Sequence, residues 1–186
     1  MGRLTRSSLE QMSAQRQVLF HKIAKGRKNV EDGHIGGPFD AWTLNPELGR
    51  RIVGLGNCFR FGLSVDRRQI EIAILVTGAY WKAEFEWYAH APMAREAGVA
   101  DSVIEAIRVG ERPLFDSSQD EAAYDLAHEL TQSRRVSDAV YERAREAFEE
   151  QGVCELINLC GFYTMVSMTL NTFDVDLPAG VSSQFD

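Results

Sequence analysis

Residues 66–98 read DRRQIEIAILVTGAYWKAEFEWYAHAPMAREAG, and their pattern predicts two successive helices. In the first half, large aliphatic residues recur at the spacing of one helical face: Ile70, Ile74 and Leu75. This helix is expected to run from Asp66 to about residue 79, and the second one from about residue 82 to 97. Gly98 then supplies a natural helix end, because glycine readily adopts the left-handed conformation that closes many helices.

The rest of the chain predicts helices as well, and no stretch shows the period-two alternation of a β-strand. Asn45 and Pro46 form a typical helix start, with a capping side chain followed by a first-turn proline. Ser118 and Glu121 form the pattern of a capping box at another start. Helices are expected at about 45–61, 101–110, from 118 onward, 137–152 and 153–173. The last is apolar on most faces and is therefore expected to be central and buried. We predict an all-α fold.

The composition suits a folded domain, because 45% of the 186 residues are hydrophobic and only 25% are charged. No run reaches the roughly 18 uninterrupted apolar residues of a membrane span, so no membrane partner is expected. The net charge of −7 argues against nucleic acid, which proteins bind largely through Lys and Arg. Three cysteines, Cys58, Cys154 and Cys160, are too few for a disulfide framework, and a cytoplasmic location is expected.

The first 30 residues are basic, with seven Lys or Arg against a single acid, Glu10. Apolar residues recur among them at near-helical spacing: Leu9, Met12, Leu19 and Ile23. This spacing favours a helical arm that packs on its own domain or on a neighbouring subunit. An organelle-targeting segment and a basic arm for an anionic partner are the alternatives.

Common motifs for phosphate, metal and thiol chemistry are missing from the sequence. Gly54 and Gly56 lack the third glycine of a dinucleotide-binding loop. The four histidines do not stand at metal-ligand spacings from one another: His21, His34, His90 and His128. We therefore expect neither a metal nor another cofactor, and we expect Cys154 and Cys160 to be buried and inert.

Residues 80–90 combine acidic, imidazole and aromatic side chains. Glu86 and His90 are four residues apart, so on a helix they share one face and can touch. A carboxylate beside an imidazole raises its basicity and fixes its tautomer, as a general acid/base requires. The alternative is a solvated Glu/His pair on an amphipathic helix, with the neighbouring aromatic residues in the core.

Glu71 is an acid within the apolar run from Ile70 to Val76. Burying its charge is costly unless the carboxylate is paired. Arg67 or Arg68 is a candidate partner for a structural salt bridge, and a functional role for Glu71 is the alternative.

The spacing Glu71-x14-Glu86-x3-His90 resembles the core pattern of the carboxymuconolactone decarboxylase family, whose relatives include alkylhydroperoxidase D-like proteins. Four flanking segments agree with that pattern: HIGGPF at 34–39, RQIEIAIL at 68–75, Gly98-Val99, and Tyr163 followed by Leu170-Asn171. The resemblance implies an oligomeric, alkylhydroperoxidase D-like helical domain over 34–178. A basic helical arm would then occupy 1–33 and a C-terminal tail 179–186.

The sequence departs from the family pattern at two places. The peroxidase branch carries Cys-x-x-Cys before the histidine, and these two positions are Ala83 and Glu86 here. Peroxide reduction by that route needs a thiolate and a resolving thiol, so it is expected to be absent. The small decarboxylases carry Gly and Pro near the C-terminal tyrosine, where this chain has Met165 and Ser167. If that stretch lines the pocket, the substrate differs from carboxymuconolactone.

The resemblance implies a cofactor-free lyase that decarboxylates a small cyclic carboxylic acid or lactone, or catalyses a related proton transfer. His90 is expected as the acid/base, with Glu86 or Glu71 orienting it. Candidates for the substrate-binding site are Trp81, Phe39, Tyr163 and Lys82. Lys82 or Arg68 would hold the carboxylate of the substrate.

Family members form trimers or hexamers, so a homotrimer or homohexamer is expected. Two other functions stay open at this point. One is a non-catalytic, ligand-binding member of the same fold, and the other is a hydroperoxide-reducing enzyme.

Overall fold

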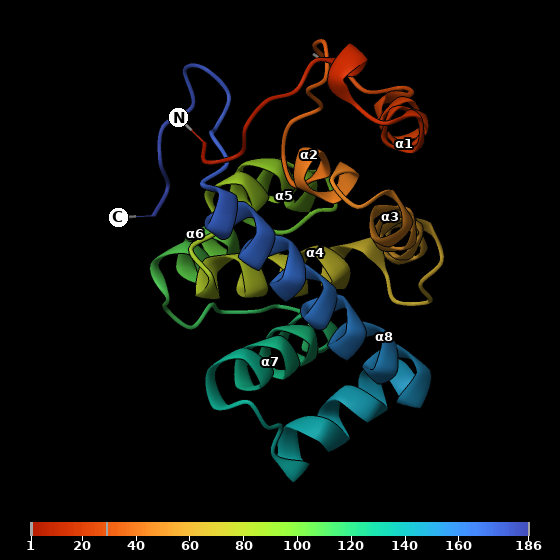
Figure 1. Cartoon of the computed structure of the whole chain (residues 1–186). Helices are drawn as coiled ribbons and strands as arrows, with labels where there is room; N and C mark the ends of the chain where they lie inside the picture. Colours follow the sequence, from red (N-terminus) through yellow and green to blue (C-terminus); the bar gives the residue numbers. More distant parts are fainter. Residues whose placement is uncertain (1, 29, 186) are drawn as a thin grey trace. The chain divides into compact units, whose positions relative to one another are not determined.

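The computed structural model describes residues 2–28 and 30–185, and within them it is built from helices without β-strands (Figure 1). One isolated β-bridge joins Glu31 and His34. The prediction of an all-α fold is therefore confirmed. The chain divides into two compact units, one made of Met1–Gly62 and Met168–Asp176, the other of Leu63–Ser167 and Leu177–Asp186.

Among its described residues, the first unit contains a short 3-10 helix, three complete α-helices and the end of α8 (Asp138–Phe173). The complete helices are η1 (Leu9–Gln11), α1 (Ala14–Ala24), α2 (Phe39–Thr43) and α3 (Pro46–Phe61). The α1 helix contacts both α2 and α3, and its apolar residues Leu19, Phe20 and Ile23 are buried. The basic N-terminal segment thus packs on its own chain and supplies part of this unit's core.

The α3 helix begins as its sequence predicts. The Asn45 side chain accepts a hydrogen bond from the Leu48 amide at 3.1 Å, Pro46 occupies the first turn, and Gly62 follows the last residue. A glycine inside α3 allows a close approach to α2. A Cβ atom at Gly49 would lie 2.2 Å from the carbonyl oxygen of Trp42, so only glycine fits there.

The HIGGPF segment at 34–39 is held by a buried aspartate. Asp40 accepts hydrogen bonds from the amides of Ile35 at 2.8 Å and Gly36 at 3.2 Å, and one of its oxygens lies 2.5 Å from His34 Nδ1. Gly36 and Gly37 both have positive φ, which glycine adopts without steric cost. The motif therefore shapes a tight loop that leads into α2.

In the second unit, α4 (Arg67–Tyr80) contacts α5 (Glu84–Glu96), α6 (Asp101–Val109) and α7 (Ser118–Ser133). Ten consecutive residues of α4, 69–78, are buried. This explains why its sequence is apolar on every face rather than amphipathic. The other helices supply apolar faces to this central element, among them Trp87, Ile104 and Leu126.

Helix starts in the second unit agree with prediction at α4 and α6, whereas α5 begins at Glu84, two residues after its predicted start, and α7 differs as well. The capping residue of α7 is Ser117, whose side chain accepts a hydrogen bond from the Asp120 amide at 3.3 Å, and Ser118 is the first helical residue. The capping-box assignment to Ser118 and Glu121 is therefore wrong by one residue. Gly110 ends α6 in the left-handed conformation, at the position where the helix was expected to stop.

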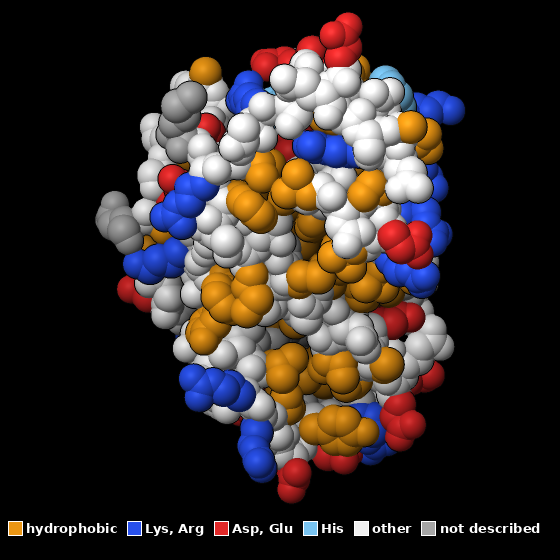
Figure 2. Space-filling model, viewed as in Figure 1, with side chains coloured by type: hydrophobic (Ala, Val, Ile, Leu, Met, Phe, Trp, Pro, Cys, Tyr) orange, Lys and Arg blue, Asp and Glu red, His pale blue; other side chains and the backbone are white. Residues whose placement is uncertain are grey.

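The last helical region, α8 (Asp138–Phe173), consists of two helices that meet at Glu149. Glu149 has φ 58° and ψ 176°, which is not helical, so the division lies three residues before the predicted one at Gly152. The second helix is buried along one side only, whereas its apolarity predicted burial on most faces. Hydrophobic side chains are visible on the face along which α8 runs (Figure 2), and Ile157 and Met168 are exposed.

By length and composition alone, α8 is also apolar enough to cross a membrane, and 44% of its most apolar window is buried. Core helices of soluble proteins meet the same criterion.

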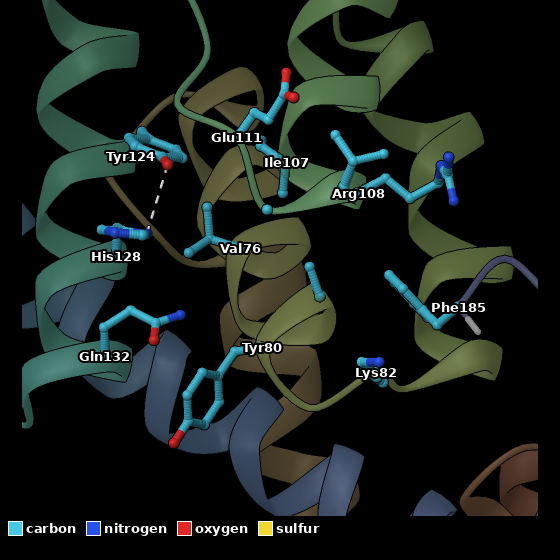
Figure 3. A pocket seen from close by; sticks show the side chains of 13 residues that line it. Val76, Tyr80, Lys82, Ile107, Arg108, Glu111, Tyr124, His128, Gln132 and Phe185 are labelled. Atoms are coloured by element: carbon cyan, nitrogen blue, oxygen red, sulfur yellow. Dashed lines mark hydrogen bonds between the residues drawn. The ribbon is translucent and has the colours of Figure 1, made fainter.

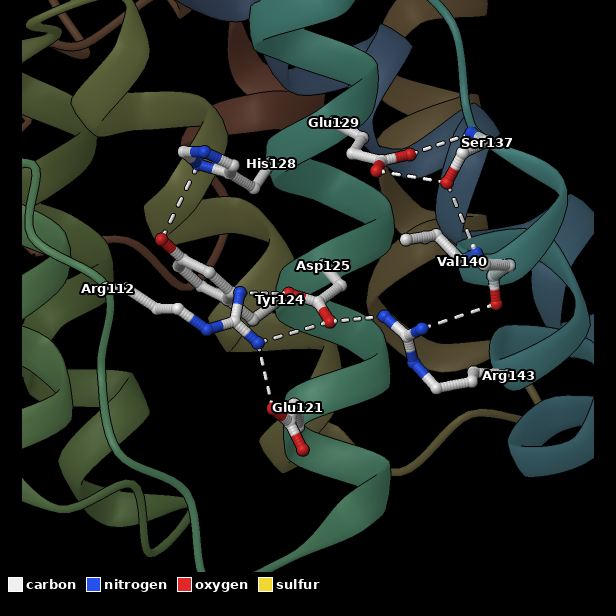
Figure 4. Close-up of polar contacts among 10 residues, drawn as sticks. Arg112, Glu121, Tyr124, Asp125, His128, Glu129, Ser137, Val140 and Arg143 are labelled. Carbon is white, nitrogen blue, oxygen red and sulfur yellow. Dashed lines mark hydrogen bonds and ion pairs between the residues drawn. The ribbon is translucent and has the colours of Figure 1, made fainter.

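An ion-pair network joins α7 to the start of α8 (Figure 4). The buried carboxylate of Asp125 accepts hydrogen bonds from Arg112 and, at 2.7 Å, from Arg143, while Glu121 pairs with Arg112 at 2.8 Å. Burial alone would raise the pKa of Asp125, but the two guanidinium groups lower it below its usual value. Since this carboxylate is charged, buried and fully paired, it fixes α7 against the first helix of α8.

Two glycines of α3 give a matched test of the close packing of α3 on α2. Gly49→Ala is expected to lower the free energy of unfolding by about 1–3 kcal/mol, because its methyl group overlaps the backbone of α2. Gly54→Ala is expected to raise it by about 0.5–1 kcal/mol, because no atom lies within 4 Å of its Cβ position. Chemical denaturation of both variants measures the difference, and equal effects would contradict the close α2–α3 contact.

Candidate active site

Three residues that the sequence singled out meet in the second unit. Glu71 comes from α4, and Glu86 and His90 come from successive turns of α5. The Nδ1 atom of His90 lies 2.8 Å from Glu71 Oε2, and its Nε2 atom lies 3.4 Å from Glu86 Oε2. One imidazole therefore has a carboxylate at each ring nitrogen. Since a carboxylate accepts, the Nδ1–H donates to Glu71, and this fixes the tautomer.

Glu71 is completely shielded from solvent, with 0% of its side chain exposed. Its second oxygen, Oε1, forms an ion pair with the guanidinium of Arg67 one helical turn earlier, but accepts no hydrogen bond from the described residues. The salt bridge that the spacing predicted is thus present, and the same carboxylate also contacts His90. The structural and the functional interpretation of Glu71 are both compatible with this geometry.

Glu86 is buried too, with 7% of its side chain exposed. Its Oε2 atom has no hydrogen-bond partner among the described residues and only the 3.4 Å approach to His90. Burial raises the pKa of Glu86 above its usual value, the charge of His90 opposes the rise, and the charge of Glu71 adds to it. The carboxyl group therefore tends to hold a proton, and the alternative of a solvated Glu/His pair is wrong.

Two candidates for the pocket wall lie close to this cluster. The ring of Tyr163, from α8, meets the His90 ring edge to face with centroids 5.0 Å apart. The Trp81 Nε1–H donates to Thr164 Oγ1 at 3.4 Å, next to Tyr163 on α8. Thr164 was not predicted as part of the site, because no motif marks a hydroxyl whose role depends on a tertiary contact.

Lys82, another predicted binding residue, lies in a pocket that the His90 cluster does not line. Lys82 lines a pocket of about 190 Å³ together with Tyr124 and His128 of α7, whose side chains form one of its walls (Figure 3). Neither His90 nor its two glutamates are among the described residues that line this pocket. The role of Lys82 in substrate binding stays a prediction.

Phe39 belongs to the first unit, where its ring lies 5.3 Å from the Trp42 ring and 3.9 Å from the guanidinium carbon of Arg27. Arg68 pairs with Asp120 at 2.6 Å. Their proposed contacts with substrate remain predictions.

The cysteines do not form a thiol site in the described part of the chain. Cys160 is buried, and burial raises the pKa of its thiol to about 11, so it stays protonated at neutral pH. Cys58 and Cys154 are exposed, so the prediction of a buried cysteine is confirmed for Cys160 and wrong for Cys154. No group of three metal-ligating side chains is found among the described residues. What the site can do is hold and move a proton.

No protein-family model and no curated protein matches this chain. Several solved structures are similar to it in fold. An uncharacterized peroxidase-related protein from Silicibacter sp. TM1040 has a TM-score of 0.74 at 17% identity, covering 96% of this chain and 92% of its own. An alkylhydroperoxidase AhpD core protein from Ralstonia eutropha JMP134, uncharacterized and peroxidase-related, has a TM-score of 0.72 at 16% identity, covering 96% and 93%. A protein of unknown function from Agrobacterium tumefaciens has a TM-score of 0.66 at 17% identity, covering 77% and 99%.

These likenesses define the class of fold: the chain is all-helical and alkylhydroperoxidase D-like. The fold that the sequence pattern implied is thereby confirmed. At this level of identity the comparison extends to the fold and not to an activity.

The raised pKa of Glu86 gives the site a pH-dependent stability. The unfolded chain ionises Glu86 near its usual pKa of 4.5, whereas the folded protein favours the protonated form. The native protein therefore loses stability as pH rises above about 4.5 toward the raised pKa. Glu86→Gln cannot ionise, so we expect its stability relative to the native protein to increase as pH rises above about 4.5, measured by chemical denaturation.

Glu84, on the same helix, is a control because its pKa is shifted in the opposite direction. Burial alone would raise the pKa of Glu84, but the Ser183 hydroxyl and the amides of Gln184 and Phe185 lower it. Its charged form stabilises the folded protein above the usual pKa of 4.5, and this contribution is lost on acidification. Glu84→Gln should therefore lose stability over the range in which Glu86→Gln gains it, and parallel curves would argue against a buried, protonated Glu86.

Proposed function

We propose that this chain is a cofactor-free acid/base enzyme of the carboxymuconolactone decarboxylase type. It would remove CO2 from a small cyclic carboxylic acid or lactone, or catalyse a related proton transfer on such a compound. The observation that supports this proposal is the imidazole of His90 with a buried carboxylate at each ring nitrogen. A histidine held in this way is suited to deliver a proton in a step that needs no redox partner.

The reaction balances with a single proton. The bond between the substrate carbon and its carboxylate breaks, CO2 leaves, and the electron pair stays on the carbon in conjugation with the lactone carbonyl. A proton from His90 Nε2 then adds to that carbon. The His90–Glu86 pair recovers one proton from water, so the net change is uptake of one proton and release of one CO2.

Each residue of the cluster has a distinct role in this proposal. Glu71 holds the Nδ1–H and stabilises the imidazolium when it forms. Glu86, whose pKa burial raises, shares the mobile proton with Nε2. Tyr163 covers one edge of the imidazole and limits its access to water. Trp81 and Lys82, which belong to the same unit, are proposed to contact the rest of the substrate.

The trimeric or hexameric assembly stays part of the proposal. Exposed apolar residues on α8, such as Ile157, are the kind of surface that a neighbouring subunit covers.

Peroxide reduction is the competing function, because two of the similar structures are described as peroxidase-related. That chemistry uses a thiolate that attacks the peroxide and a second thiol that resolves the product. Here Glu86 contacts the histidine instead, and the buried Cys160 has a raised pKa.

We expect the protein to consume no alkyl hydroperoxide above the level of a variant with Cys58, Cys154 and Cys160 changed to serine. A dithiol-coupled peroxide assay measures both. Consumption that the serine variant abolishes would establish a thiol peroxidase and overturn the proposed lyase.

The lyase proposal is tested by following loss of carboxymuconolactone absorbance and release of CO2. We expect His90→Ala to lower kcat/KM by about 10²- to 10⁴-fold, the usual contribution of a general acid. His21→Ala is the control, because His21 is an exposed histidine of α1 that has no role in the proposed site. It should keep activity.

If carboxymuconolactone is not turned over, a panel of cyclic carboxylic acids is tested in deuterated water for exchange at the acidic carbon. Exchange that requires His90 supports proton transfer on another substrate. Absence of both reactions across the panel would contradict the enzyme and favour the non-catalytic, ligand-binding function.

A further inference from the structure

Two neighbouring arginines of α4 look equivalent by position. Arg67 and Arg68 open the helix and have nearly equal side-chain exposure, 37% and 38%. Each pairs with a carboxylate that is almost completely buried, Arg67 with Glu71 and Arg68 with Asp120. By burial and charge alone, both pairs would count as structural.

The second oxygen of each carboxylate distinguishes them. Asp120 Oδ1 accepts a hydrogen bond from the Gln69 side-chain amide at 2.6 Å. The other partner of the Arg68–Asp120 pair is therefore a neutral group that does not titrate. Glu71 Oε2 lies 2.8 Å from His90 Nδ1. The other partner of the Arg67–Glu71 pair is therefore an imidazole, which can take up or lose a proton. Of the two arginines, only Arg67 is linked through its carboxylate to His90.

A charge count shows what this link does. With Glu71 ionised and Arg67 protonated, the two charges cancel. The remaining pair, His90 and Glu86, can then hold one shared proton in two ways, as a neutral imidazole beside a protonated carboxyl or as an imidazolium beside a carboxylate. Both arrangements keep the cluster at net zero charge, the condition that a low-dielectric site favours.

We propose that Arg67 is a positioning residue that sets the proton affinity of the His90–Glu86 pair by holding Glu71 in its ionised form. It acts through Glu71 and does not touch the proton. The inference rests on the proposed function for its relevance to catalysis, but the proton affinity can be measured without any substrate.

The charged and titratable groups around His90 come from three elements. Arg67 and Glu71 face it from α4, Glu86 lies on its own helix α5, and Tyr163 meets its ring from α8. Without Arg67 the cluster carries an uncompensated negative charge, which favours every protonated form. The apparent pKa of the pair must therefore rise.

The experiment follows the His90 ring by NMR over a pH titration of the full chain, with His90→Gln used to assign its signal. We expect Arg67→Gln to raise the titration midpoint by roughly one pH unit, the lower end of the effect of a neighbouring charge, because Arg67 is partly exposed. Arg68→Gln, the matched control, should leave the midpoint within a small fraction of that shift. A midpoint that both variants move equally, or that Arg67→Gln lowers, would overturn the proposal.

A charge-balanced variant covers the case in which Arg67→Gln fails to fold. Arg67→Gln combined with Glu71→Gln removes both charges and leaves two neutral amides that can pair. The midpoint should then return to the native value or fall below it. A purely structural role for Arg67 predicts no such return, so a midpoint that stays raised in the double variant would contradict the proposal.

The titration also separates this inference from the lyase assignment. If Arg67→Gln shifts the midpoint but no cyclic acid is turned over, the electrostatic role of Arg67 stands and the lyase falls. If turnover depends on His90 but Arg67→Gln does not shift the midpoint, the lyase stands and the electrostatic role of Arg67 falls.

Discussion

The central constraint in the second unit is the carboxylate of Glu71, which lies inside a helix that is buried on every face. An unpaired charge at that depth would cost far more than a small domain can recover from packing. The protein resolves this by giving each oxygen a partner: Arg67 on the same helix and His90 on the next one. Because His90 comes from α5, the pairing also fixes how α5 lies against α4, so the fold and the candidate site depend on the same contact.

Placing a second carboxylate next to the same imidazole has a chemical consequence. Glu86 is too buried to be stable as an isolated anion, and its pKa is accordingly raised. In the peroxidase-type sequence pattern this position holds a cysteine. A carboxyl group cannot replace the attacking thiolate, but beside an imidazole it can share a proton, so this position suits proton transfer instead of thiol redox chemistry. The helices that position the residues can remain the same while the chemistry differs, which is why a fold alone does not define an activity.

Local signals in the sequence predicted the elements that depend on local physics. The Asn45 cap, the glycine stops after α5 and α6, and the apolar α4 with its single acid all follow from short-range patterns. The break at Glu149 was misplaced because no glycine or proline marks it. In the site, the helical spacing predicted Glu86 beside His90 and offered Arg67 or Arg68 for Glu71. The choice of Arg67 and the contact of Glu71 with His90 depend on how α4 packs on its neighbours.

The most direct test of this account is the protonation state of His90 in the native protein at neutral pH, observed by long-range proton–nitrogen correlation NMR. The account predicts that Nδ1 carries a proton in every populated form, with a strongly downfield, slowly exchanging resonance from its hydrogen bond to Glu71. A histidine that carries its proton on Nε2 alone, with Nδ1 bare and the ring titrating like an exposed side chain, would contradict the carboxylate–imidazole–carboxylate arrangement on which the proposed function depends.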